Sequence, residues 1–223
     1  MDTITQWDGN FLIGLQQALN SEPMTLIMKG FTLLAEYGVL PIAACLLMMA
    51  WPKTRRLGII CSLSLAFTFL CCNLIIKPIV DRPRPWVVFE MVKPMMPPFG
   101  DASFPSAHTA NFMAVAWAVF IASLPGRIRI TSPGGSERTE RSYEESLPLG
   151  WHGSSVSARP VHVTGAVLLV LSFLVGISRL YLGMHYPSDV IAGLILGVLC
   201  ATAVYTALRK YEEKHNVIGA VKE

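Results

Sequence analysis

Long apolar stretches alternate with short polar segments along most of the chain, and they predict helices that cross a membrane. A spanning helix needs about 20 mainly apolar residues, and it satisfies its own backbone hydrogen bonds in lipid. Four stretches of 18 to 20 residues contain no Asp, Glu, Lys or Arg, and a further one carries Glu36 in its outer half. The five stretches are 24 or 30 to 51, 57–76, 106–124, 161–178 and 190–208.

Two other segments complete the predicted organisation. Residues 8–22 have the pattern of a short amphipathic helix that lies at the membrane surface. Residues 125–160 are rich in Ser, Gly, Arg and Glu, which is typical of a flexible loop; a docking or regulatory segment is the alternative. The predicted fold class is all-α: a polytopic membrane helix bundle of about five transmembrane helices plus an N-terminal interfacial helix, forming a single membrane-embedded domain over 1–223.

Composition supports a membrane protein and excludes several other classes. Hydrophobic residues make up 52% of the chain and charged residues 15%, whereas about a quarter of a soluble domain is charged. A net charge of +3 from scattered basic residues does not suit a nucleic-acid-binding module. The five cysteines lie in apolar stretches without C-x-x-C spacing, so we expect small buried side chains rather than disulfides. The N-terminus lacks the basic start of a secretory signal, so we expect no cleaved leader.

The positions of Lys and Arg predict the orientation of the spans. Of the 18 basic residues, 12 lie in three segments on one side of the predicted bundle: three after the first stretch, five in 125–160 and four in the C-terminal tail. Because basic residues concentrate on the cytoplasmic side, we expect a multi-pass protein of the cell (inner) membrane. The N-terminus is then outside and the C-terminus is cytoplasmic.

Most of the other chemically active side chains form three clusters on the predicted outer face. Taken singly, each has a structural explanation, since basic residues at helix ends reach for lipid headgroups and Ser106 suits a helix N-cap. Together they supply cations, histidines, a carboxylate and a helix N-terminus. The clusters are Lys77-Pro-Ile-Val-Asp81-Arg82-Pro-Arg84-Pro85, Phe104-Pro105-Ser106-Ala107-His108-Thr109, and Ser178-Arg179 followed by His185 and Asp189.

The cationic residues of these clusters have the chemistry of a phosphate site that uses no metal. Lys77 and Arg84 are seven residues apart, or two turns if the helix continues, so both can point at one spot. Arg179 adds a planar fork that matches phosphate oxygens. The hydroxyl of Ser106, with the backbone N–H groups of Ser106 and its neighbours, can bind an anionic oxygen at a helix N-terminus.

The two histidines and Asp189 add a nucleophile and an acid. Asp189 can hold one ring nitrogen of His185 so that the other nitrogen carries the lone pair that attacks phosphorus. His108 is then left to protonate the leaving oxygen. Pro187 between His185 and Asp189 is expected in the first helical turn, so the pair need not lie on one regular helical face.

These residues resemble the motifs of the type 2 phosphatidic acid phosphatase superfamily of membrane lipid phosphatases. Its three motifs are K-x6-R-P, P-S-G-H and S-R-x5-H-x3-D, and all three spacings are met over roughly residues 57–208. The matching positions are Lys77 with Arg84-Pro85, Pro105-Ser106-Ala107-His108, and Ser178-Arg179 with His185 and Asp189.

The resemblance implies a role for each matching residue. His185 is the nucleophile that forms a phosphohistidine, Asp189 orients it and His108 is the general acid. The implied phosphate ligands are Lys77, Arg84, Ser106, Ala107 and Arg179. The chain has Ala107 where the family usually has glycine, and we expect activity to be retained. Arg82 is also followed by proline, but the motif spacing selects Arg84.

The resemblance also implies a lipid phosphate substrate, the bilayer as the surroundings, and no metal or other cofactor. The small number of spans and the aromatic residues of 86–104 look like the bacterial undecaprenyl pyrophosphate phosphatase branch. Phosphatidylglycerophosphate, phosphatidate and lipid A phosphates stay open as substrates. The alternatives are a lipid phosphotransferase of the same fold and an anion-binding membrane transporter. The oligomeric state is left open, and no nucleic-acid partner is expected.

Overall fold

Helices make up most of the described part of the chain, so the predicted all-α fold is confirmed. The computed structural model describes residues 3–98, 100–124 and 158–220, and the predicted flexible loop lies outside them except for 158–160, which begin a helix. In chain order the elements are α1 (Thr3–Leu19), α2 (Glu22–Leu33), the 3-10 turn η1 (Glu36–Gly38), α3 (Val39–Ala50), α4 (Arg55–Phe69), the π-helical segment η2 (Leu70–Ile76), α5 (Lys77–Val80), α6 (Pro85–Val88), α7 (Ala107–Ala122), α8 (Ala158–Tyr181) and α9 (Pro187–Ala220).

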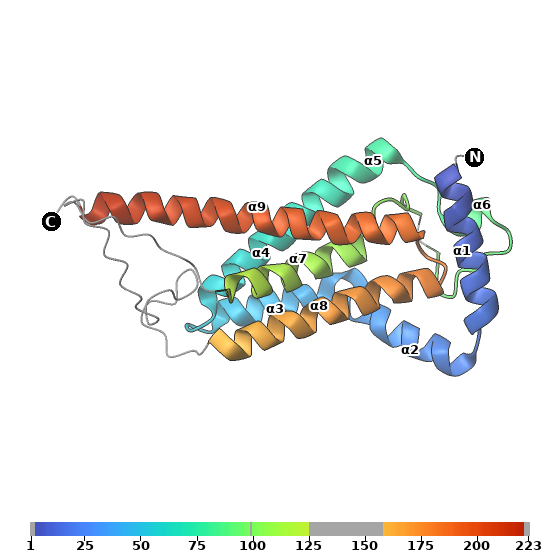
Figure 1. The fold of residues 1–223 in the computed structure, drawn as a ribbon, viewed down its shortest axis with the longest axis horizontal. Helices are drawn as coiled ribbons and strands as arrows, with labels where there is room; N and C mark the ends of the chain where they lie inside the picture. The colour runs from blue at the N-terminus through green and yellow to red at the C-terminus, as the bar shows by residue number, and fades with distance from the viewer. Residues whose placement is uncertain (1–2, 99, 125–157, 221–223) are drawn as a thin grey trace, which may run out of the picture.

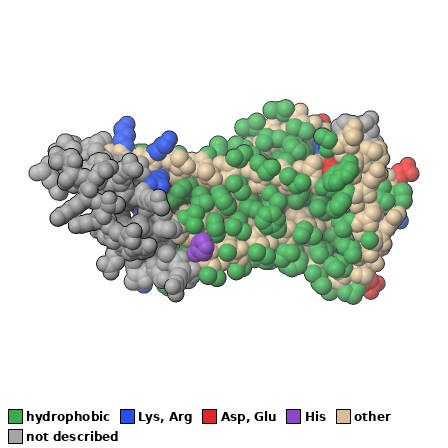
Figure 2. Space-filling model, in the orientation of Figure 1, with side chains coloured by type: hydrophobic (Ala, Val, Ile, Leu, Met, Phe, Trp, Pro, Cys, Tyr) green, Lys and Arg blue, Asp and Glu red, His purple; other side chains and the backbone are tan. Residues whose placement is uncertain are grey.

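The longer apolar helices run along one axis and form a bundle, and α1 lies across one end of it (Figure 1). Among the described residues, three helical runs are long and apolar enough to cross a membrane: Arg55–Val88, Val161–Tyr181 and Pro187–Tyr211. Two shorter apolar helices, α3 and α7, lie beside them. On the face shown in Figure 2, hydrophobic side chains cover the middle of the bundle, as expected for a surface that contacts lipid.

The first predicted span is not one helix, so that expectation is wrong in detail. Helix α2 ends at Leu33, η1 follows, and α3 begins at Val39. The break coincides with Gly38, which has φ +67, a left-handed conformation that glycine adopts without a steric penalty. Because a carboxylate inside a lipid-facing helix is costly, the break also lets Glu36 turn toward the polar end of the bundle.

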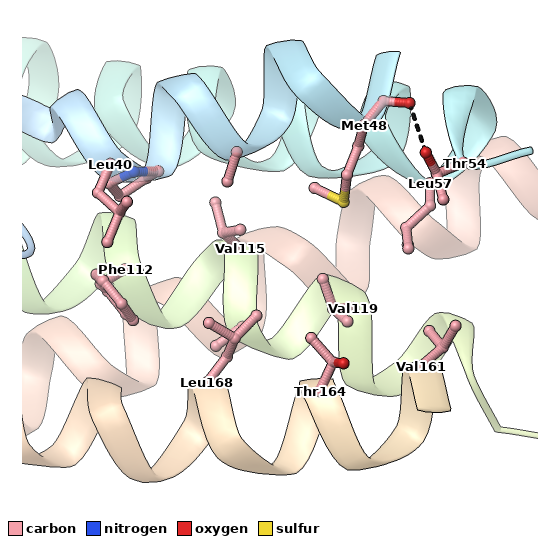
Figure 3. A pocket seen from close by; sticks show the side chains of 13 residues that line it. Leu40, Met48, Thr54, Leu57, Phe112, Val115, Val119, Val161, Thr164 and Leu168 are labelled. Atoms are coloured by element: carbon pink, nitrogen blue, oxygen red, sulfur yellow. Dashed lines mark hydrogen bonds between the residues drawn. The ribbon is translucent and has the colours of Figure 1, made fainter. Parts of the chain in front are cut away.

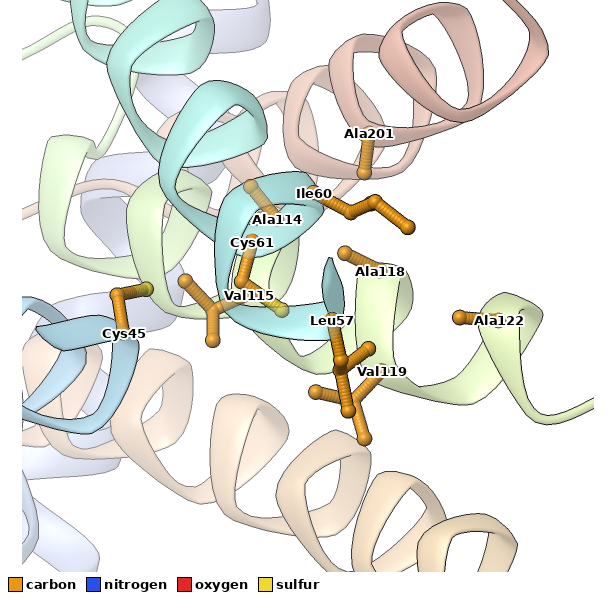
Figure 4. Close-up of a cluster of buried hydrophobic side chains, with 10 residues drawn as sticks. All are labelled: Cys45, Leu57, Ile60, Cys61, Ala114, Val115, Ala118, Val119, Ala122 and Ala201. Atoms are coloured by element: carbon orange, nitrogen blue, oxygen red, sulfur yellow. The ribbon is translucent and has the colours of Figure 1, made fainter. Parts of the chain in front are cut away.

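Small side chains bring α7 close to its neighbours in the centre of the bundle. Figure 4 shows alanines of α7 packed among Leu57, Ile60 and Cys61 of α4, with Ala201 of α9 beside them. An ideal Cβ placed on Gly197 of α9 would lie 2.5 Å from the carbonyl oxygen of Ala110. Such a contact shows that the α7 and α9 backbones approach too closely for any side chain at this position.

Helix α3 is less tightly packed, because a cavity lies on each side of it. One cavity, of about 380 Å³, lies between α3, α7 and α8, and its lining is almost entirely apolar (Figure 3). Leu40 and Met48 of α3 face Leu168 and Val161 of α8 across it. The second cavity is larger and reaches the polar end of the bundle, where the candidate site lies.

Candidate active site

The structure brings the predicted site residues together at the end of the bundle where α1 lies. Their elements are far apart in sequence but meet because α5, α7, α8 and α9 all begin or end there (Figure 1). Lys77 begins α5 directly after the π-helical segment, Arg84 precedes α6, Ser106 precedes α7, Arg179 is near the end of α8, His185 lies between α8 and α9, and Asp189 is in the first turn of α9.

The imidazole of His185 is held as one tautomer. Its Nδ1 lies 2.9 Å from the carbonyl oxygen of Ser103, which can only accept, so Nδ1 carries the proton and donates it. Nε2 then carries the lone pair, and Nη1 of Arg84 donates to it at 3.3 Å. The tautomer is therefore the one that a nucleophilic Nε2 requires.

Asp189 stands next to His185 but is not its nearest acceptor. Its Oδ2 lies 3.6 Å from Nδ1 of His185, and it accepts hydrogen bonds from the Ser103 hydroxyl and from the backbone N–H of Tyr186. The hydrogen bond from Tyr186 is half of a capping box, since Tyr186 directly precedes α9 and Asp189 is the third residue of that helix. As expected, Pro187 begins α9, and His185 and Asp189 still lie side by side. The sequence motifs did not predict the Ser103 carbonyl, which also orients His185.

The surroundings of His185 favour its neutral form. Burial lowers the pKa of the imidazole to about 3, against the opposing effect of the Asp189 carboxylate and with the help of the charges of Arg84 and Arg179. The side chain is only 1% exposed. A neutral imidazole with its lone pair on Nε2 is the form that can attack phosphorus.

Lys77 and Arg84 both bind the carboxylate of Asp101. Lys77 Nζ contacts Oδ2, and Nη2 of Arg84 contacts Oδ1. Burial would raise the pKa of Asp101, but the hydrogen bonds and charges of the two cations outweigh it and lower this pKa to about 2. The side chain of Asp101 is 51% exposed, so its carboxylate is accessible to solvent. It contacts the two cationic residues that the motifs predict to bind phosphate.

His108 and Arg179 meet at a second carboxylate, Glu36. Oε2 of Glu36 lies 3.8 Å from Nε2 of His108 and 4.0 Å from Nη1 of Arg179. Arg179 is fully buried, and its Nη1 also donates to the Thr32 hydroxyl of α2 at 2.8 Å. The broken first span therefore supplies the Thr32 hydroxyl, which bonds Arg179, and the Glu36 carboxylate, which lies beside both Arg179 and the predicted general acid.

The start of α7 differs in one respect from the expected anion site. The backbone N–H of Ser106 donates to the carbonyl of Asp189 at 3.0 Å, and its hydroxyl pairs with that of Thr109 at 2.9 Å. The Ser106 N–H is thus already used in joining α7 to α9, which leaves residues 107–109 as the first-turn donors. Ala107 is helical and has no positive φ, so its backbone does not require the glycine that the family motif carries.

The larger cavity joins this site to the apolar flank of α3. Its volume is about 880 Å³. Lys77, Arg84, Asp101, His108 and Asn111 line its polar part, and side chains of α3, α4 and η2, among them Ile42, Leu46, Leu65 and Leu70, line the rest. Arg84 connects the cavity with the predicted nucleophile, since it lines the cavity and also contacts Nε2 of His185. The shape suits a ligand with an anionic head and an apolar tail.

Several site residues were missed by the sequence motifs, although some carry a signal. Asp8, Leu12 and Gln16 recur every four residues and form the buried face of α1, so two polar side chains stand where an amphipathic helix should be apolar. Asp101 and Ser103 lie just before the second motif.

Within the described residues, no group of three or more His, Cys, Asp or Glu side chains could hold a metal ion.

The fold and the site together define a class: a helical membrane protein with a histidine, lysine and arginine site at one end of its bundle. The family model described as PAP2 superfamily matches residues 57–213, more than half of the chain. The chain belongs to the PAP2 superfamily.

Three curated relatives are similar to part of the chain. A bacitracin transport permease protein BcrC from Bacillus licheniformis is 31% identical over 119 residues, 53% of this chain and 40% of that protein. An undecaprenyl-diphosphatase BcrC from Bacillus subtilis (strain 168) is 25% identical over 130 residues, 58% and 47% of the two chains. A decaprenylphosphoryl-5-phosphoribose phosphatase from Mycobacterium tuberculosis is 30% identical over 123 residues, 53% and 69%. The match thus spans less than half of each Bacillus relative.

Two solved structures share the fold. One is a transmembrane PAP2-type phosphatidylglycerolphosphate phosphatase from Bacillus subtilis, with TM-score 0.64, 23% identity, and coverage of 96% of this chain and 88% of that one. The other is LpxE from Aquifex aeolicus, with TM-score 0.62, 19% identity, and coverage of 88% and 93%. At these identities the likeness shows the architecture alone.

Proposed function

We propose that the protein is an integral membrane lipid phosphatase that removes a terminal phosphate through a phosphohistidine. The observation that carries this proposal is the cavity that joins Lys77, Arg84 and His108 to an apolar groove, with Nε2 of His185 next to Arg84. The motif roles given above for His185, His108, Asp189 and the phosphate ligands are part of the proposal. The catalytic unit is one membrane-embedded domain.

The reaction proceeds in two displacements at phosphorus. Nε2 of His185 attacks the terminal phosphorus, the bond to the lipid oxygen breaks, and the imidazolium form of His108 gives one proton to that oxygen and becomes neutral. Water then attacks the phosphohistidine, His108 takes a proton from it, and inorganic phosphate leaves while His185 becomes neutral again. Lys77, Arg84 and Arg179 stabilise the charge on the transferring oxygens, and the phosphate displaces the carboxylate of Asp101.

The proposed substrate is undecaprenyl diphosphate, which yields undecaprenyl phosphate for reuse in cell-wall synthesis. Two relatives support a polyprenyl substrate by name, the undecaprenyl-diphosphatase and the decaprenylphosphoryl-5-phosphoribose phosphatase. The apolar lining of the cavity along α3 and α4 supports a lipid tail but does not select its length. Phosphatidylglycerophosphate, phosphatidate and lipid A phosphates are the competing substrates.

We also propose that the site faces the outside of the cell membrane. The catalytic end of the bundle holds the N-terminal helix, and the opposite end receives the C-terminal part of α9 (Figure 1). On the face shown in Figure 2, Lys and Arg gather mainly near that opposite end. This distribution supports a cytoplasmic C-terminus and an outward-facing headgroup site.

The test is phosphate release by purified protein in detergent without added metal, with the competing lipid mono- and diphosphates assayed side by side. We expect undecaprenyl diphosphate to have the highest kcat/KM and His185→Ala to stop release. His162→Ala is the matched control, because His162 bonds Ser123 at the far end of the bundle, and it should stay active. Undiminished release by His185→Ala would contradict the mechanism. Labelled phosphate appearing in a second lipid would identify a phosphotransferase, and no turnover of any lipid would favour an anion-binding transporter.

A further inference from the structure

The N-terminal helix α1 places a fully buried carboxylate, Asp8, beside the catalytic end of the bundle. Helix α1 lies outside the residues matched by the family model. Gln16 holds α1 there by exchanging hydrogen bonds with the backbone of Lys93, and the side chain of Asp8 is 0% exposed. A buried carboxylate is costly unless it is paired and hydrogen-bonded, so the partners of Asp8 explain its position.

Asp8 and Asp189 share one guanidinium, that of Arg82. Nη2 of Arg82 lies 2.8 Å from Oδ2 of Asp8, and its Nη1 lies 2.6 Å from Oδ1 of Asp189. The Ser188 hydroxyl contacts both Asp8 and Arg82. The guanidinium also stacks on Tyr186, 4.0 Å from the ring centroid. Arg82 is therefore held in one orientation, with one carboxylate on each amino group.

This arrangement makes Asp8 part of the electrostatic surroundings of His185. Asp189 presents Oδ2 toward His185 and Oδ1 toward Arg82, so the guanidinium neutralises part of the negative charge that His185 experiences. Asp8 balances that guanidinium from the other side, and the three groups together carry one net negative charge. Without Asp8 their net charge is zero.

We propose that Asp8, acting through Arg82, is a positioning residue that keeps Asp189 oriented and negative enough to support positive charge on His185. The inference rests on the proposed function, because the imidazole ring becomes positive when Nε2 bonds to phosphorus and loses that charge when water releases the phosphate. Arg82 orients Asp189 from the side opposite His185 and mediates the effect of Asp8, whereas Arg84 contacts Nε2 of His185 directly. The family motifs contain neither Asp8 nor Arg82.

The kinetic test compares Asp8→Asn with Asp81→Asn. The control makes the same chemical change at an exposed carboxylate, and Asn tolerates the left-handed backbone at residue 81. We expect Asp8→Asn to lower kcat about 10- to 100-fold, as loss of a partner of an orienting group does, and to leave KM within about twofold. Asp81→Asn should keep both constants. Asp8→Glu, which keeps the charge, should retain kcat within about threefold of the wild type even if Asp8→Asn fails to fold.

A second readout needs no substrate. In protein labelled with ¹⁵N-histidine, with the His185 signals assigned by His185→Gln, Asp8→Asn should move the ring signals of His185 and leave those of His162 in place. Unchanged His185 signals, or a loss of activity carried by KM alone, would overturn the inference. If the wild type turns over no lipid, the proposed function fails, while the His185 signals still decide whether Asp8 is coupled to the site.

Discussion

At the residue scale, the site selects one chemical form of His185. The Ser103 carbonyl fixes the proton on Nδ1, Arg84 approaches Nε2, and burial opposes a charged ring. Asp189 works against burial, but burial dominates and the imidazole stays neutral, which is the form that the proposed attack on phosphorus requires. The other two carboxylates of the site, Asp101 and Glu36, have a different role. Asp101 pairs with Lys77 and Arg84, the two cations that the proposed function assigns to phosphate, and Glu36 stands between His108 and Arg179.

The lowered pKa of His185 predicts a titration far from that of ordinary histidine. The pKa falls from 6.5 to about 3, so the ring should stay neutral between pH 8 and pH 5. Because the unfolded chain binds this proton near pH 6.5, the folded protein loses stability as the pH falls below that value. A ¹⁵N-histidine titration of the detergent-solubilised protein measures the change. A His185 midpoint near pH 6.5 would contradict the neutral buried ring.

At the element scale, α7 is the helix on which the site is assembled. It contacts α4, α8 and α9, and its first residues carry the second motif. Glycines on α9 let the two backbones meet: a Cβ on Gly193 would lie 2.7 Å from the Ser106 carbonyl oxygen, and one on Gly197 would lie 2.5 Å from that of Ala110. This close approach is what allows the Ser106 N–H to bond the Asp189 carbonyl and so joins two of the motifs.

Gly197→Ala should therefore loosen the bundle. The added Cβ meets backbone atoms of α7 that cannot rotate away, so we expect a loss of about 1–3 kcal/mol in stability, the usual cost of overpacking. Thermal unfolding in detergent measures it. Gly14→Ala is the matched control, since nothing lies within 4 Å of a Cβ at that exposed position of α1, and alanine favours a helix by about 1 kcal/mol over glycine. Equal melting temperatures for wild type and Gly197→Ala would argue against the close contact.

At the scale of the whole molecule, the two ends of the bundle have different chemistry. One end carries α1 and the buried network of Asp8, Arg82 and Asp189, while the other receives the end of α9 and most of the basic side chains on the face in view (Figures 1 and 2). The cavity links the first end to apolar surface along α3, so a lipid can place its head at the site while its tail stays among apolar side chains.

The proposed topology predicts where the C-terminus lies. A reporter fused after Lys210 should behave as cytoplasmic in intact cells, because basic residues flank the spans on that side. An alkaline phosphatase and a fluorescent protein fused at the same point give opposite signals and serve as controls for each other. Activity of the alkaline phosphatase fusion would place the C-terminus outside and the catalytic end inside.

The sequence by itself determined that the protein lies in a membrane, that it is helical, where its apolar stretches are and which residues form the motifs. Those properties depend on the composition of single segments and on spacing along the chain, because bilayer thickness and helix geometry constrain each segment separately. Only the tertiary structure decided that the first stretch breaks at Gly38, that Ser103 shares the orientation of His185, and that Asp8 reaches Asp189 through Arg82. The side-chain contacts among these join residues up to 107 positions apart, the separation of Arg82 and Asp189. Burial of Asp8, His185 and Asp189 in the assembled bundle makes these contacts necessary, because a buried charge or polar group needs a partner.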